Sequence, residues 1–98
     1  MLRLTVRHQS PEETVLQVDG WVANEEAEVL AAEGRRLLRV SRRLVLELAG
    51  VAFIDAAGLA LLEELAGPRL VLRDGSPFIQ HLLERHGLRC EEGGEAGR

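Results

Sequence analysis

The chain has 98 residues, a formal net charge of −4 and 12 cationic side chains, all of them arginine. This length accommodates one domain with a modest hydrophobic core. The negative charge argues against a nucleic-acid partner, because contacts to phosphate dominate that binding. Without lysine, Schiff-base chemistry and the lysine of a P-loop are excluded. Three aromatic residues, none of them tyrosine, are too few for a base-stacking platform.

The hydrophobicity of the chain and its cysteine content indicate the cellular compartment in which the protein is expected. No apolar run approaches the roughly 20 residues that a membrane-spanning helix needs, so direct membrane insertion is not expected. Cys90 is the single cysteine and has no partner for an internal disulfide. We therefore expect a protein of the reducing cytoplasm.

The N-terminal segment predicts a β-hairpin. Residues 2–7 alternate apolar and polar side chains, which is typical of a strand with one face in water. The alternation resumes over residues 14–18, after a polar turn that contains Pro11. Asp19 and Gly20 are expected to end this second strand.

A helix and a third strand are predicted next. Asn24 is a favourable N-cap, and two glutamates follow it in the first turn, where the helix dipole stabilises anions. Apolar residues then recur at helical spacing over residues 27–38, which predicts an amphipathic helix of three to four turns. Residues 43–49 form a nearly continuous apolar run, which indicates a strand in a central position of a sheet.

The second half of the chain predicts two further helices around one strand. Asp55 is expected to cap a helix that begins at Ala56. Residues 70–72 predict a strand, and Ser76 with Pro77 predicts an N-cap followed by proline at the first helical position.

The C-terminal segment contains a residue that is expected to end the last helix, and a polar tail follows it. Gly87 is expected to end the last helix, with Leu88 folding back onto it. Residues 90–98 have the composition of disorder. We therefore expect one domain over residues 1–89 and a disordered tail over residues 90–98.

The predicted order is β-β-α-β-α-β-α, which indicates an α/β fold. Strands joined through helices run parallel, whereas the hairpin is antiparallel, so the sheet is mixed. One face of the strands is polar, and we expect it to stay in water while the helices are layered mainly on the other face. The polar side chains are those of Arg3, Thr5, Arg7, Gln17, Glu47 and Arg73.

One segment of the chain carries a family signature. Residues 44–62 (LVLELAGVAFIDAAGLALL) join a buried strand, an apolar loop and an Asp-x-x-Gly turn that opens a helix. Together with the turn at residues 18–22 (VDGWV) and the element order, this segment resembles the STAS family, named for sulfate transporters and anti-sigma-factor antagonists. The resemblance covers residues 2–88 and implies a STAS-like fold and a role in protein binding.

The resemblance also points to a position that departs from the family. In the antagonists, the residue after the aspartate is a serine that is phosphorylated by a partner kinase, which is also the anti-sigma factor. Ala56 stands at this position and Ala57 offers no substitute hydroxyl, so we expect no phosphorylation there. Glu47 stands where many members carry aspartate, and residues 63–69 form a shorter stretch than the family's second helix and linker.

The resemblance implies a partner surface at the N-terminus of the second helix and the loop over residues 20–25. A helical wheel places small and acidic side chains on the side of this helix opposite its leucines. Small side chains allow close approach of a partner, and acidic ones orient an arginine-bearing partner. The candidate partner-binding residues are Trp21, Asn24, Asp55, Ala56, Ala57, Gly58, Ala60 and Glu63.

Most of these residues also have a purely structural interpretation. Asp55 fits an N-cap, and Gly58 fits close packing of a helix on the sheet. Ala56 and Ala60 are good helix formers, and Trp21 fits a boundary residue that covers the end of the sheet. Both interpretations stay open at the level of the sequence.

Catalytic and metal-binding patterns do not stand out. His81 and His86 are five residues apart, which fits a shared metal on one helix face less well than a spacing of four. The serines lie in turns or caps and not in a Gly-x-Ser-x-Gly elbow, and Cys90 has no CxxC partner. We expect neither an enzyme nor a metal or cofactor.

Three functions are therefore compared. The leading hypothesis is a non-enzymatic regulatory module like an anti-sigma-factor antagonist, without the phospho-switch serine, whose partner is an anti-sigma factor or a related kinase-fold regulator. The alternative is a cytoplasmic STAS subunit bound to the ATPase of an ABC transporter of the lipid-asymmetry type, since the Asp-Ala-Ala-Gly stretch is similar to that branch's Asp-Thr-Ala-Gly turn. A nucleotide or anion at the helix N-terminus ranks third, because a glycine-rich loop and a nearby cation are missing.

Overall fold

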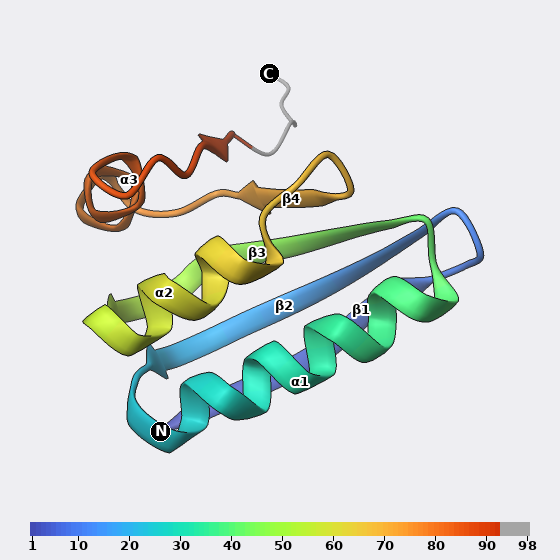
Figure 1. Ribbon diagram of the computed structural model, residues 1–98, viewed down its shortest axis with the longest axis horizontal. Coiled ribbons are helices and arrows are strands. Elements are labelled where there is room, and N and C mark those ends of the chain that lie inside the picture. The colour runs from blue at the N-terminus through green and yellow to red at the C-terminus, as the bar shows by residue number, and fades with distance from the viewer. Residues whose placement is uncertain (93–98) are drawn as a thin grey trace.

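Five strands form one mixed sheet in the spatial order β1-β2-β3-β4-β5 in a computed structural model that describes residues 1–92 (Figure 1). β1 and β2 pair antiparallel, and the other neighbours pair parallel. The strands are β1 (Leu2–Gln9), β2 (Glu13–Val22), β3 (Arg43–Ile54), β4 (Leu70–Arg73) and β5 (Cys90–Glu91). The helices are α1 (Asn24–Val40), α2 (Ala56–Leu65) and α3 (Pro77–Glu84).

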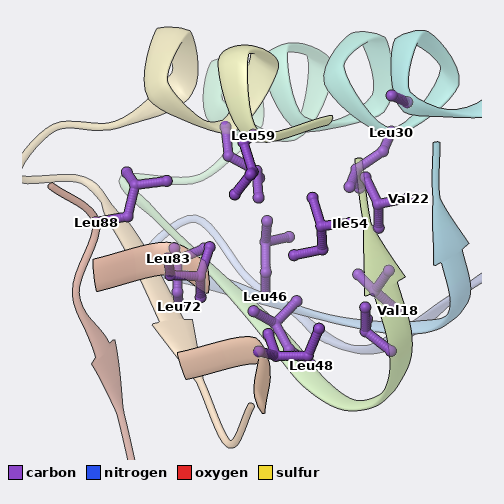
Figure 2. Close-up of a cluster of buried hydrophobic side chains, with 14 of the residues drawn as sticks. Val18, Val22, Leu30, Leu46, Leu48, Ile54, Leu59, Leu72, Leu83 and Leu88 are labelled. Carbon is purple, nitrogen blue, oxygen red and sulfur yellow. The ribbon is translucent and has the colours of Figure 1, made fainter. Parts of the chain in front are cut away.

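The predicted α/β class and element order are confirmed. α1 and α2 lie in front of β1 to β3 in Figure 1, and all three helices contribute to one buried cluster on this side of the sheet. Figure 2 shows these side chains between the sheet and the helices. They include Leu30 of α1, Leu59 of α2 and Leu83 of α3, which belong to the same cluster as Leu46 and Leu48 of β3.

The other face of the sheet is polar, as the alternation predicts. The Arg7 guanidinium donates from Nη1 to Oε1 of Gln17 and to Oε1 of Glu47, both at 3.2 Å. Arg73 approaches the same Glu47 carboxylate at 3.8 Å. These residues come from four adjacent strands, so a ladder of polar side chains crosses the sheet, and we refer to this side as the open face.

Several local signals act as predicted. The Ser76 side chain accepts from the backbone N–H of Ile79 at 3.2 Å, which caps α3. Gly87 has φ of +73°, and the N–H of Leu88 donates to the Leu83 carbonyl at 2.9 Å. This pattern closes the end of the helix and buries Leu88 in the core.

The start of α1 corrects the sequence prediction. Ala23 is the N-cap, and no side chain caps the helix there. Asn24 is instead the first helical residue, with φ of +56°, a conformation that asparagine tolerates better than most residues. Its backbone N–H is bound by a distant carboxylate, described below, so its own side chain is not needed as a cap.

The strands are longer than the sequence suggests. β2 continues through Asp19 to Val22, because Gly20 adopts φ of +100° without leaving the sheet. Residues 90 and 91, expected in a disordered tail, form β5 beside β4. The rest of the expected tail, residues 93–98, lies outside the described residues. None of the helices within residues 1–92 has both the length and the apolar character needed to cross a membrane.

Candidate functional site

The carboxyl ends of β2 and β3 meet the first turns of α1 and α2, and Asp55 connects them. Its Oδ1 accepts from the Gly58 N–H at 2.7 Å, and its Oδ2 accepts from the Asn24 N–H at 3.0 Å. The Asp55 N–H donates to the Val22 carbonyl at 3.1 Å. One residue therefore caps α2 and also holds the turn between β2 and α1.

Gly58 is buried beneath the first turn of α2. A Cβ built on it would lie 2.4 Å from the carbonyl oxygen of Val22 and 2.9 Å from Cγ2 of Ile54. Only glycine lets α2 approach the sheet this closely. Gly58 is buried, in agreement with its interpretation as a packing glycine that sets the position of the helix, while its role at a partner surface stays a prediction.

The outward side of α2 forms a surface of small side chains with an acidic end. Ala56, Ala57, Ala60 and Glu63 are exposed, and we call these four residues the α2 surface. Oε2 of Glu63 lies 2.8 Å from Nδ1 of His86, beyond the end of α3. No local pattern predicts this contact, because the two residues are 23 positions apart in the chain.

Trp21 lies on a different side of the molecule from the α2 surface. Its neighbour Val22 is buried in the core, and so is Ile54 beside Phe53. Because successive side chains of a strand point to opposite faces, Trp21 and Phe53 lie on the open face. Their ring centroids are 6.4 Å apart with the planes at 72°, an edge-to-face pair.

Two irregularities in the pairing of β2 with β3 bring these rings together. The register shifts between Gln17 and Asp19 and again between Gly20 and Trp21, so that Trp21 pairs with Phe53. Sequence reasoning missed Phe53 because β3 was expected to end at residue 49. A second aromatic residue in an apolar run before the capping aspartate was the available signal.

The hollows described next lie outside the α2 surface. One of about 270 Å³ is on the open face, between Arg7 and Asp19. Another of about 570 Å³ is lined in part by Arg43 and Arg69. In the latter, Arg43 pairs with Glu13 at 2.5 Å and Arg69 donates to backbone carbonyls, so its cations are already engaged. Within residues 1–92 no three histidine, cysteine or acidic side chains stand close enough together to hold a metal ion.

Comparisons with known proteins place the chain in a family. Residues 5–89 match the family model described as "Mlab, STAS domain". Among solved structures, the unphosphorylated form of the anti-sigma factor antagonist SpoIIAA aligns with a TM-score of 0.72 at 20% identity, over 97% of this chain and 90% of that one. The phosphorylated form of SpoIIAA, a Bacillus cell fate determinant, aligns with a TM-score of 0.66 at 19% identity, over 97% and 93%. A search of curated protein sequences finds no match.

The match to the family model spans most of the chain, and the likeness to SpoIIAA extends the same fold over nearly all of it. The motif at Asp55 sits where the fold brings two helix starts and two strand ends together. The chain therefore belongs to the STAS domain family, whose members are typically not catalytic.

Proposed function

We propose that the protein is a non-enzymatic module that binds a protein partner through the α2 surface and the adjoining turn at Asn24. The observation that carries this proposal is the exposed run of alanines on α2, held at a fixed position by the Asp55 cap and by Gly58. Small side chains on a rigid helix allow close approach of a partner without the loss of side-chain entropy that long residues incur.

The partner of the leading proposal is an anti-sigma factor or a kinase-fold regulator. Its support is the likeness to SpoIIAA, which is described as an anti-sigma factor antagonist in both an unphosphorylated and a phosphorylated form. Ala56 follows the capping aspartate and carries no hydroxyl. We propose that binding by this chain is not switched by a phosphate at that position.

A second candidate is a subunit of an ABC transporter of the lipid-asymmetry type. The specific observation that favours it is the description of the matching family model as Mlab. The same α2 surface would then bind the transporter's ATPase. Both candidates place the protein in the cytoplasm, with its partner.

A nucleotide or anion site at the start of α2 has less support. The Asp55 carboxylate already accepts from the Gly58 N–H, so a negative charge occupies the place that an anion would take. Repulsion between this carboxylate and a phosphate opposes such a site.

The test of the docking surface is Ala56→Glu. The partner is sought among proteins encoded beside the gene, as a kinase-like regulator or as an ATPase with its permease. A glutamate would place a carboxylate and extra bulk against a surface shaped for a methyl group, so we expect a loss of about 2 kcal/mol or more in calorimetric binding. The fold should persist, because the dipole favours glutamate in a first turn.

Arg85→Ala is the matched control, because Arg85 is exposed just beyond α3 and outside the α2 surface. It should leave both affinity and melting temperature near wild type. Unchanged affinity of Ala56→Glu in a protein that melts like wild type would place the interface elsewhere.

The absence of a phospho-switch has its own test. Incubation with a kinase-fold partner and ATP should leave residues 55–58 unmodified by mass spectrometry, since none of them has a hydroxyl. Kinase-dependent phosphate on Ser41 or Ser76, together with altered binding, would contradict the proposal of an unswitched module.

A further inference from the structure

All three aromatic side chains of the protein lie at its surface. Within residues 1–92 the buried hydrophobic core is aliphatic. Trp21 is 55% exposed and Phe53 is 40% exposed, and the two rings touch each other on the open face. Burial of an aromatic ring contributes a large favourable free energy. An adjacent pair of exposed rings therefore indicates a surface that another molecule covers.

A fixed carboxylate stands beside these rings. Asp19 lies two residues before Trp21, on the same face of β2. Its Oδ2 accepts from Nε2 of Gln17 at 2.8 Å, which holds the carboxylate without neutralising it. The nearby ion pairs join Arg7 and Arg73 to Glu47. Arg3 lies opposite Asp19 in the pairing of β1 with β2 and lines a hollow of about 410 Å³ with it, but no cation of residues 1–92 comes within ion-pair distance of the Asp19 carboxylate.

Gly50 makes room for this carboxylate. It pairs with Asp19 across the first register shift, and a Cβ built on it would lie 1.8 Å from Oδ1 of Asp19. β3 therefore has no side chain at the point where the Asp19 carboxylate packs against its backbone. We call Asp19, Trp21 and Phe53 the aromatic corner.

The exposed rings alone are too small to hold a second copy of this chain. From typical areas for buried aromatic residues, the exposed parts of Trp21 and Phe53 together amount to about 200 Å². A stable protein pair buries about 800 Å² on each side. The occupant must therefore also use the charge beside the rings.

One side chain satisfies both features of the corner. An arginine guanidinium stacks on aromatic rings and forms two parallel hydrogen bonds with a carboxylate. Residues two apart along a strand are about 7 Å apart, so a guanidinium between Asp19 and Trp21 reaches both.

We propose that the aromatic corner is a second docking surface, which receives an arginine next to an apolar residue from a partner protein. It lies on the open face of the sheet, whereas the α2 surface lies outside the helical layer. The proposal for the aromatic corner does not depend on the function proposed for the α2 surface.

Binding can be measured with a defined probe, the capped dipeptide acetyl-Leu-Arg-amide, and its neutral counterpart with citrulline in place of arginine. Trp21 is the single tryptophan, so its fluorescence reports on the corner directly, and amide NMR shifts map the site. We expect the arginine peptide to shift signals at the corner and to bind about fivefold more tightly than the citrulline peptide.

Variants separate the components of the site. Asp19→Asn and Phe53→Ala should each weaken the arginine peptide about three- to fivefold. Gly50→Ala should weaken it similarly, because the new Cβ turns the Asp19 carboxylate away without removing it. The melting temperature of each variant shows whether it is folded.

The matched controls are Glu28→Gln and Val29→Ala, which make comparable changes at exposed positions of α1. These two variants should bind the peptide like wild type. Equal affinities for the two peptides, or an unchanged affinity in folded Asp19→Asn, would overturn the proposal. Fluorescence that changes with protein concentration alone would assign the corner to a second copy of the chain and would also overturn it.

Discussion

The two ends of the sheet hold a helix terminus in opposite ways. At the carboxyl end, the Asp55 carboxylate accepts from the backbone N–H groups of Gly58 and Asn24. At the amino end, the Arg69 guanidinium donates to the Ser41 carbonyl at 3.0 Å and to the Leu38 carbonyl, at the end of α1. Each charge has the sign that the helix dipole favours at its position.

The ends differ in what else surrounds these charges. At the amino end, Ser41 is buried and its hydroxyl donates to the Ser10 carbonyl at 2.5 Å, so the Thr14 hydroxyl must donate to Ser41 at 2.7 Å. At the carboxyl end, Asp55 is followed by the small exposed side chains of Ala56 and Ala57. Substitutions at the amino end should therefore change stability alone, whereas those at the carboxyl end should divide into effects on stability and effects on binding.

The largest effect on stability is expected for Asp55→Ala. It removes the cap of α2 and also the acceptor of the Asn24 N–H, so the free energy of unfolding should fall by about 2–3 kcal/mol in urea titrations. Asp55→Asn keeps one acceptor oxygen and should lose roughly half as much. A loss below about 0.5 kcal/mol for Asp55→Ala would show that the carboxylate does not hold the carboxyl end together.

At the amino end, Ser41→Ala should cost about 1–2 kcal/mol in the same titration. It leaves the Ser10 carbonyl and the buried Thr14 hydroxyl without their partner. Thr14→Val should cost less, because the bond from Ser41 to Ser10 remains. Equal losses for the two variants would contradict the hydrogen-bond direction assigned here. Neither variant should alter binding to a partner of the α2 surface.

Arg69→Met tests the cation that holds the end of α1. The apolar stem is retained while the guanidinium is lost, so we expect a decrease of about 1 kcal/mol in the free energy of unfolding. Arg85→Ala removes an exposed arginine outside this contact and should change stability little. If the two variants behave alike, the carbonyl contacts of Arg69 contribute nothing measurable.

The sequence predicted local contacts better than distant ones. The cap on α2, the cap on α3 and the turn at Gly87 each depend on residues within five positions of one another, and all three are confirmed. The hydrogen bond from Asn24 to Asp55 spans 31 residues, and the one from Arg69 to the Ser41 carbonyl spans 28. No local pattern in the sequence predicts either contact. The prediction of Asn24 as the N-cap of α1 was wrong, because its side chain is a good capping group and the sequence does not show that the Asp55 carboxylate accepts from the Asn24 N–H.

The candidate site was predicted in composition but not in arrangement. Exposure of Ala56, Ala60 and Glu63 follows from helical periodicity, which holds within one element. The separation of Trp21 from these residues depends on the face of a strand, and β3 changes its alternation through two register shifts. A shift of one residue moves every following side chain to the other face, so Phe53 could not be placed from the sequence.

The smallest predicted effect concerns Cys90 in β5, at the carboxyl end of the sheet. Burial raises the pKa of the Cys90 thiol, and the Gly75 N–H, which donates to its sulfur at 3.2 Å, opposes the shift only in part. The folded state therefore holds the thiol proton at pH values where the unfolded chain, with an ordinary pKa of about 8.5, releases it. The stability contributed by the protonated thiol is complete below that pH and is lost as the pH rises above it. We expect urea titrations to show that the free energy of unfolding of wild type, relative to that of Cys90→Ala, falls between pH 7 and about pH 9.5. If the difference between the two proteins is the same at both pH values, the thiol is as exposed in the folded protein as in the unfolded chain.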